Sequence, residues 1–425
     1  MTHSGSLAAP RPETTDERGE NRSGRPGHAT CRPRRRGGTG PPMQIPETEI
    51  HARLDRLAAL AENTGLRGVL VFGRSFYDRP GPVGYLTGFL PPFPSSADAP
   101  QISGLGQVAL VLPAERKPVL FVDRFVRPFA SPHFDVESSP DVAAAVAAAL
   151  RRLGPADAAW GVGGGDIAPF GLFDAVRRDL PGVAWRSLDS ELHAMRRRKS
   201  PADVLGMRRA AEVAAAGFEV AVQAVRAGAR ERDVAAAGMA GAMAAGADFV
   251  RYLRVHAGEA SAVGSRWPPA TDARIKAGDL VSMDFVGAAG GYGFDLERTV
   301  LVSPAEDSAY QLLRDAHEIE AAALAAVHAG QTVEGLIDAI RAAAAGTKSA
   351  AYLSGFFGHG IGIETLEWPY LIPGQTGTLV AGEVLCIEPG LKRLGFGGAE
   401  VEDEVLVTET GYELLSPFLR QPIIV

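Results

Sequence analysis

The sequence is poor in cysteine and lacks long apolar runs. Its 425 residues include only two cysteines, Cys31 and Cys386, which excludes a disulfide framework and suits a reducing compartment. No uninterrupted apolar run approaches the ~20 residues that a membrane-spanning helix needs. The N-terminus also lacks the charged and then apolar pattern of a secretion signal. We therefore expect a cytoplasmic protein with no membrane partner.

An excess of positive charge is also missing. The formal net charge is −7, which argues against nucleic acid as the main partner. Hydrophobic residues make up 46% of the chain and charged residues 22%, as is typical of globular proteins. A chain of 425 residues exceeds one ordinary core, so we expect two domains.

Residues 1–42 differ in composition from the rest of the chain. They are rich in Pro, Gly, Arg, Ser and Thr and carry almost no large apolar groups. Such a segment cannot bury enough surface to order itself, which predicts a disordered tail. Two other readings stay open: an upstream misassigned start, with Met43 as the true one, and a role for the basic run 34–36 in touching nucleic acid or acidic lipid.

Residues 43–195 alternate between helical and strand patterns. Apolar residues at helical spacing predict a helix over 50–65, and the run 68–73 predicts a strand. The next predicted elements are a hairpin over 108–113 and 117–123, a helix over 141–153, a strand over 158–164 and a helix over 170–180. This alternation predicts an α/β domain.

Residues 196–425 begin at a basic joint and become rich in strands. Four basic residues precede Ser200 and Pro201, which suit the N-cap and first turn of a helix. Alanine-rich helices are predicted to about Ala245. Strands follow over 251–258, 279–287 and 292–302, then helices over 305–329 and 332–345, then strands over 356–364, 383–391 and 399–408. This order predicts an α+β domain with antiparallel strands enclosed by helices.

Five candidate metal ligands fall on the later strands. They are Asp284, Asp295, His359, Glu388 and Glu402. Each stands beside glycine or apolar neighbours, where a lone charge is costly to bury, and divalent cations would remove that cost. The mostly oxygen set suits Mn²⁺, Fe²⁺, Co²⁺ or Zn²⁺. Taken singly, the aspartates could be turn residues, Glu402 a surface charge and His359 a core histidine.

The order and spacing of these residues resemble those of the pita-bread metallohydrolases. This superfamily includes methionine aminopeptidase, aminopeptidase P, prolidase and creatinase. The resemblance is carried by GYLTGF (84–89), the joint RRRKSPADVLGMRRAA (196–211), the eleven-residue spacing of the two aspartates, GHGIG (358–362) and EPG (388–390). It implies an α/β creatinase-like N-terminal domain followed by an α+β pita-bread catalytic domain.

The resemblance also implies roles for the five ligands. Asp284 is then a ligand of one metal, Asp295 and Glu402 bridge both, and His359 and Glu388 bind the second. The implied enzyme is a Xaa-Pro aminopeptidase or dipeptidase with two divalent ions, manganese first. A metal-bridging hydroxide attacks the amide carbonyl, and Glu388 also takes part in proton transfer. Relatives of this layout are usually dimers, and the loop 89–100 is a candidate to reach the partner's site.

Three positions depart from the pattern of the prolyl peptidases. Trp267 and Leu366 stand where those enzymes have proton-donating histidines, and Glu400 stands where they often have an arginine. Losing one such donor typically costs ~10²–10³ in rate, so losing both argues against an efficient prolyl peptidase but not against metal chemistry, because no ligand is lost. The catalytic candidates are His256 and Glu367, although a strand histidine such as His256 is also well explained by packing.

Two other functions remain open from the sequence. Trp267 and the Glu367-Trp368-Pro369 segment are similar to the dimethylsulfoniopropionate lyases of this fold. Aromatic rings at Trp267 and Trp368, with Glu400 nearby, could hold a cationic substrate by cation–π attraction, or could simply pack the pocket rim. The first alternative is therefore a hydrolase or lyase of a small cationic or amide metabolite. The second is a catalytically inactive binding protein of the same fold.

Overall fold

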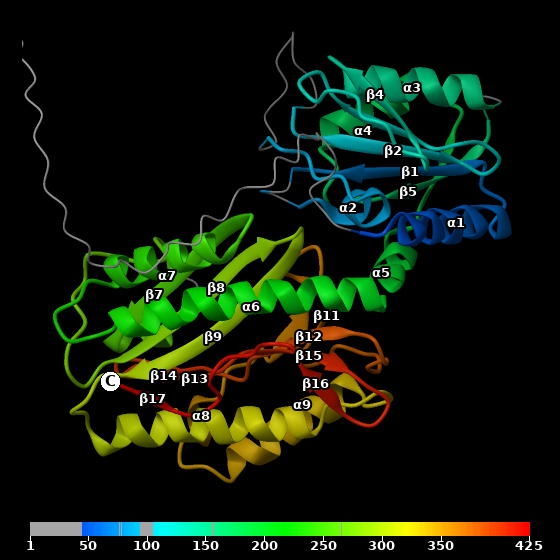
Figure 1. Cartoon of the computed structure of the whole chain (residues 1–425). Helices are drawn as coiled ribbons and strands as arrows, with labels where there is room; N and C mark the ends of the chain where they lie inside the picture. The colour runs from blue at the N-terminus through cyan, green and yellow to red at the C-terminus, as the bar shows by residue number, and fades with distance from the viewer. Residues whose placement is uncertain (1–44, 76, 78, 94–104, 155–156, 265) are drawn as a thin grey trace, which may run out of the picture. The chain divides into compact units, whose positions relative to one another are not determined.

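The computed structural model describes residues 45–425, apart from 76, 78, 94–104, 155–156 and 265 (Figure 1). The predicted tail with its basic run 34–36, the cysteine Cys31 and most of the loop 89–100 lie outside the described residues. None of the helices in the described part is long and apolar enough to cross a membrane.

The N-terminal part is built on one mixed sheet covered by helices on both faces. The sheet has the order β4-β3-β2-β1-β5-β6, with β1 antiparallel to β2 and parallel to β5. Its strands are β1 (Gly68–Gly73), β2 (Val108–Pro113), β3 (Val119–Asp123), β4 (Asp135–Ser139), β5 (Ala159–Gly163) and β6 (Ala184–Ser187). The predicted strand and hairpin are confirmed. The outer strands β4 and β6 were not predicted, because their sequences are polar and partly exposed.

Helices explain why the central strands are apolar on both faces. One set of β1 and β2 side chains packs against α3 (Val142–Leu153) and α4 (Phe170–Asp179). The alternate set packs against α1 (Glu47–Asn63) and α2 (Gly81–Thr87). A strand buried on both faces reads as a continuous apolar run rather than an alternation, as GVLVFG does.

Three helices lead from this part into the C-terminal part. They are α5 (Asp189–Arg197), α6 (Pro201–Ala224) and α7 (Glu231–Ala245). Ser200 caps α6 as predicted, in a reciprocal capping box with Asp203. Gly217 lets α6 lie close to the sheet beneath it, since a Cβ there would come within 2.6 Å of Phe285.

The C-terminal part has two larger sheets that face each other between helices, and a short two-stranded sheet, β13-β14. The first has the order β17-β9-β8-β7 and is covered by α6 and α7 (Figure 1). The second has the order β11-β10-β12-β15-β16 and is covered by α8 (Asp307–Ala325) and α9 (Val333–Ala345). The strands are β7 (Phe249–Ala257), β8 (Leu280–Ala289), β9 (Tyr292–Leu301), β10 (Gly358–Gly360), β11 (Glu367–Tyr370), β12 (Val384–Ile387), β13 (Leu391–Arg393), β14 (Gly397–Ala399), β15 (Asp403–Val407), β16 (Tyr412–Leu414) and β17 (Ile423–Ile424).

This layering decides where polar side chains can meet. Side chains of β8, β9, β10 and β12 that point inward lie between the two sheets, away from the covering helices. The strand predicted over 356–364 is only the three-residue β10, whose pairing with β11 shifts register between His359 and Gly360. The chain after Gly360 therefore leaves the sheet and runs along the edge of the inner space.

Candidate metal centre and substrate pocket

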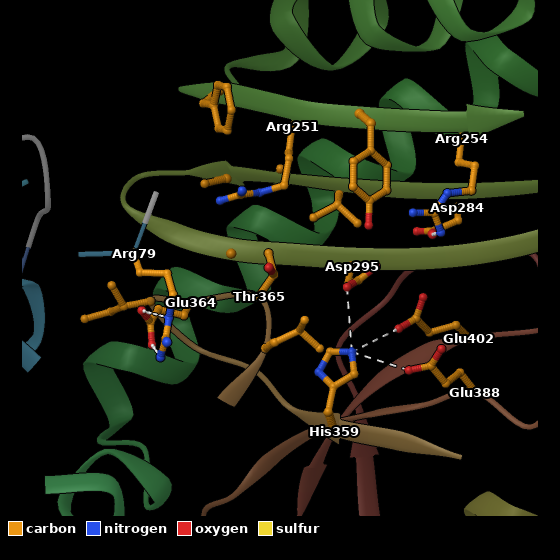
Figure 2. Close-up of a pocket in the computed structure, with 18 of the residues that line it drawn as sticks. Arg79, Arg251, Arg254, Asp284, Asp295, His359, Glu364, Thr365, Glu388 and Glu402 are labelled. Carbon is orange, nitrogen blue, oxygen red and sulfur yellow. Dashed lines mark hydrogen bonds and ion pairs between the residues drawn. The ribbon is translucent and has the colours of Figure 1, made fainter. Parts of the chain in front are cut away.

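A cavity of about 420 Å³ opens between the two sheets. Its walls come from β7, β8 and β9, from the segment Ile363–Leu366, and from Arg79 and Pro80 of the N-terminal part. All five predicted ligands line it, as Figure 2 shows. The sequence-predicted ligand set is thus gathered in one place, although its members are up to 118 residues apart in the chain (402 − 284).

Three of the four carboxylates of this set are buried, Glu388 is partly buried, and all four repel one another. Asp284, Asp295 and Glu402 are 8%, 7% and 2% exposed. Burial, with help from the neighbouring Glu297, raises the pKa of Asp284 to about 7. Burial and the surrounding carboxylates raise the pKa values of Asp295, Glu388 and Glu402 well above their ordinary range. Such a group of acids is stable in the ionised form only when cations compensate it.

His359 is held in the form that ligates a metal. Its Nδ1 lies 2.9 Å from the carbonyl oxygen of Gly360, and since a carbonyl only accepts, Nδ1 carries the proton. Burial lowers the pKa of His359 to about 4, so the ring is neutral at pH 7. The lone pair on Nε2 then faces Glu388, Asp295 and Glu402 at 3.4, 3.7 and 3.9 Å (Figure 2).

Cys386 is a member of this cluster that the sequence did not suggest. Ligand atoms of Asp295, His359, Cys386 and Glu402 all lie within 4.8 Å of one another. The available signal was its position two residues before Glu388, which puts both side chains on one face of a strand. A neutral imidazole, a sulfur and buried acids whose charge needs compensation are a donor set that fits divalent metal ions.

Asp284 stands apart from this compact set because an arginine holds it. Arg254 Nη1 donates to Asp284 Oδ2 at 2.6 Å. The two residues are register partners on β7 and β8, so their backbones fix them side by side. The pair places a protein cation at one end of the carboxylate cluster, and no feature of the sequence pattern predicted it.

A β-bulge at Arg251 shapes the opposite wall of the cavity. The register between β7 and β8 shifts between Val250 and Tyr252, so Arg251 is an extra residue on β7. The bulge restarts the inside–outside alternation. Phe249, Arg251, Tyr252 and Arg254 consequently all line the cavity, while Val250 packs in the core. With Arg79, three guanidinium groups line the cavity that holds the acids (Figure 2).

The predicted pocket residues are not all brought into this cavity. Leu366 lines it and is 50% exposed. Trp267 is 83% exposed and is not among the described residues that line it. Trp368 lines a smaller adjoining cavity of about 210 Å³, and Arg197 lies 4.4 Å from its ring centroid. Glu400 is buried in an ion pair with Lys392, and burial raises the pKa of Glu400 to about 8.

The two candidate proton donors also lie outside the described lining of the main cavity. His256 is 1% exposed on β7, and burial lowers its pKa. Glu367 accepts from Arg196 at 2.7 Å and from Lys199 at 3.2 Å. These cations overcome the effect of burial and hold the pKa of Glu367 at about 2, so it keeps no proton to give at neutral pH. The structure offers Tyr252 instead, which lines the cavity beside the acids.

A partly buried ion network holds the segment Ile363–Leu366, which lines the cavity. Glu364 accepts from Arg196 at 2.8 Å and from Arg79 at 3.1 Å. Arg79 also pairs with Asp166 at 2.8 Å. The network ties the segment Ile363–Leu366 to the basic joint and to the N-terminal part. The basic run 196–199 was the sequence signal, but its carboxylate partners lie about 170 residues later.

Comparisons with known proteins agree with this arrangement. The family description "Metallopeptidase family M24" matches residues 206–409, and "Creatinase/Prolidase N-terminal domain" matches residues 53–198. The chain is 27% identical over 266 residues to a Xaa-Pro dipeptidase of Pyrococcus horikoshii, covering 60% of this chain and 72% of the relative. It is 35% identical over 142 residues to the probable dipeptidase PepE of Mycobacterium tuberculosis, covering 33% and 38%.

Solved structures share the fold over most of the chain. A Xaa-Pro dipeptidase from Bacillus anthracis aligns with a TM-score of 0.75 at 22% identity, covering 88% of this chain and all of that one. Dipeptidase PepE from Mycobacterium ulcerans aligns with a TM-score of 0.72 at 28% identity, covering 90% and 99%. The predicted fold class is confirmed, and the family implies divalent metal ions as cofactors. The chain is a metallohydrolase that belongs to the pita-bread metallopeptidase superfamily, with a creatinase-type N-terminal domain before its M24 catalytic domain.

Proposed function

We propose that this protein is a dinuclear metal-dependent peptidase that hydrolyses the amide bond of small Xaa-Pro peptides. The observation that carries the proposal is one cavity in which buried acids and a neutral histidine stand across from a wall lined by arginines. Its volume of about 420 Å³ lies in the range of small-molecule sites. Relatives named Xaa-Pro dipeptidase support the peptide substrate.

The proposed ligand roles are those that the family resemblance implies. Asp295 and Glu402 would serve both ions, Asp284 would serve one, and His359 and Glu388 would serve the other. When bound, the ions supply an activated water by lowering its pKa to about 7 and polarise the carbonyl. Glu388, whose side chain is 15% exposed at the cavity, accepts a proton from the attacking water and returns it to the leaving amine. Manganese is the first ion to test.

Tyr252 is the proposed donor to the developing oxyanion. It lines the cavity, and its pKa is raised above its ordinary value by burial first and then by Asp284, Asp295 and Glu402. The phenol is therefore protonated throughout the neutral range and can donate a hydrogen bond. Tyr252 would supply the hydrogen bond that histidines supply in the prolyl peptidases, since Leu366 and Trp267 stand at the positions of those histidines here. His256 and Glu367 remain predictions for this role, with less support because neither is among the described residues lining the cavity.

The arginine wall favours a substrate that presents a carboxylate. Arg251 and Arg254 stand on the β7 wall and Arg79 closes the cavity nearby. A dipeptide whose scissile amide lies at the acids would direct its C-terminal carboxylate toward these groups, where paired hydrogen bonds are strong. Guanidinium groups repel a cationic substrate. Of the alternative substrates, a small amide metabolite with an acidic end is therefore better supported than a cationic one. An inactive binding protein is less favoured, because the full donor set is present.

The first experiment compares Xaa-Pro dipeptides, their C-terminal amides and Xaa-Pro tripeptides as substrates. The protein is loaded with Mn²⁺, and Glu402→Ala serves as the blank. We expect turnover of dipeptides that the blank lacks, with kcat/KM lower for the amides. No turnover of any peptide by protein that holds two ions would contradict the peptidase proposal and direct the search to acidic amide metabolites. The protein is also proposed to be a cytoplasmic homodimer, and sedimentation of the purified protein tests the dimer.

A further inference from the structure

A single thiol lies inside the candidate metal centre. Cys386 is fully buried on β12 and is the register partner of His359 on β10 and of Glu404 on β15. Its side chain lies on the strand face that it shares with Val384, toward the sheet that carries Asp295, whereas Leu385 and Ile387 pack against the other core with α8 and α9. The sulfur thus belongs to the inner space between the sheets.

A second and independent observation points to a ligand at this place. His359 is 2% exposed, and its Nδ1 is bound to the carbonyl of Gly360, which leaves Nε2 as the ring nitrogen that can bind an ion. That nitrogen is directed into the acid cluster, at 3.4 Å from the nearest oxygen of Glu388 (Figure 2). A neutral imidazole nitrogen directed at buried acids is an arrangement that a cation among them would stabilise.

The distances place the sulfur within the same coordination space. Candidate ligand atoms of Asp295, His359, Cys386 and Glu402 lie within 4.8 Å of one another. One ion bound by nitrogen and oxygen donors of this set therefore has the sulfur close by. Sulfur is a soft donor, which binds zinc, cadmium or cobalt better than it binds manganese.

We propose that Cys386 is a further metal-directed residue, whose sulfur gives the histidine side of this centre a preference for thiophilic ions over Mn²⁺. The inference rests on the proposed metal centre and refines which ions it selects. On coordination the S–H bond breaks, its proton passes to solvent, and the sulfur lone pair bonds the ion, so that no oxidant or reductant is needed. The other proposed ion site, at Asp284, has oxygen donors, and Arg254 donates a hydrogen bond to that carboxylate.

Cobalt reports a sulfur ligand directly, without reference to activity. Metal-free full-length protein is titrated with Co²⁺ and followed in the near ultraviolet, where bonds between sulfur and cobalt absorb by charge transfer. We expect such a band in the wild type and in Cys31→Ser, and its loss in Cys386→Ser with at least one Co²⁺ still bound. Since these are the only two cysteines, the pair of variants assigns the band.

Competition between ions gives the second readout. We expect the preference for Cd²⁺ over Mn²⁺ to fall about tenfold or more in Cys386→Ser, with one proton fewer released per Cd²⁺ bound. Cys386→Ala, compared with the wild type by thermal melting, controls for a folding defect of the serine variant. Wild-type protein that binds Co²⁺ with no charge-transfer band and prefers Mn²⁺ overturns the role of Cys386 and leaves the proposed function standing. Protein that binds no divalent ion overturns both.

Discussion

Removing the charge of Arg254 should strengthen the binding of the second metal ion. Arg254 Nη1 and Asp284 Oδ2 are 2.6 Å apart, and their side chains are 22% and 12% exposed. Unit charges about 4 Å apart interact with about 4 kcal/mol at an effective dielectric constant of 20. Partial exposure and the freedom of the guanidinium group to move aside reduce this to about 1–2 kcal/mol. An ion at Asp284 must overcome that energy, so Arg254→Gln should raise its affinity about 5- to 30-fold.

Calorimetric titration of metal-free protein with Mn²⁺ resolves this effect, because the ion at the His359 side and the ion at Asp284 should bind in separate steps. Only the step at Asp284 should change. Arg254→Lys keeps the charge and should bind Mn²⁺ nearly as the wild type does. Arg251→Gln removes the same charge from the same strand and should have a smaller effect. Unchanged or weaker binding of the second ion by Arg254→Gln would refute the idea that this arginine competes with the metal.

Three further predictions follow from the same geometry. Tyr252→Phe should lower kcat about 10²-fold in the peptide assay with metal content unchanged, whereas His256→Gln should have little effect; the reverse result would restore His256 as the donor. Arg196→Met should lower the free energy of unfolding by about 3–5 kcal/mol in urea melts, because Glu364 and Glu367 stay buried but lose this cationic partner. The control is Arg341→Met at an exposed ion pair, which should lower it by under about 1 kcal/mol. Metal should raise the melting temperature more at pH 8 than at pH 6; a larger rise at pH 6 would count against the ligand assignment.

The sign of that pH effect comes from the raised pKa values of the acids. In the metal-free fold Asp284 titrates near pH 7 and the other three carboxyls well above their ordinary range. The folded state therefore holds more protons than the unfolded one, and the metal-free protein loses stability as pH rises through these pKa values. Metal ions must displace those protons, so their affinity and their stabilisation grow with pH. His359 acts oppositely but below pH 6.5, since its pKa is lowered to about 4.

The candidate ligands could be named from the sequence because each lies in a short motif on a strand or directly beside one. The alternation of β8 and β9 fixes the direction of Asp284 and Asp295 without knowledge of the rest of the fold. Most helices and strands were predictable for the same reason, since capping residues and apolar periodicity act within a few residues; the short helices α2 and α5 were not predicted. Ser200 with Asp203 and the run GVLVFG are examples.

Contacts between distant segments could not be predicted in this way. Glu367 was predicted as a proton donor without knowledge of its ion pairs with Arg196 and Lys199, which lie about 170 residues earlier in the chain. Trp267 matched a catalytic position by its place in the order of motifs, yet it is 83% exposed. The pairing of Arg254 with Asp284 depends on strand register. The approach of Cys386 to Asp295 depends on how two sheets stack.

The acids and the arginine wall occupy different strands, which allows one to change without the other. The ligands come from β8, β9, β10 and the segments beside β12 and β15, whereas the wall comes from β7, the edge strand of its sheet. An edge strand tolerates a bulge because only one neighbour must keep register, and the bulge at Arg251 turns more side chains toward the cavity. Substitutions at Phe249 or Arg251 should therefore alter KM and substrate choice at constant metal stoichiometry. Arg254 is the exception, since it contacts both the cavity and a ligand, and a variant there should shift substrate and metal binding together.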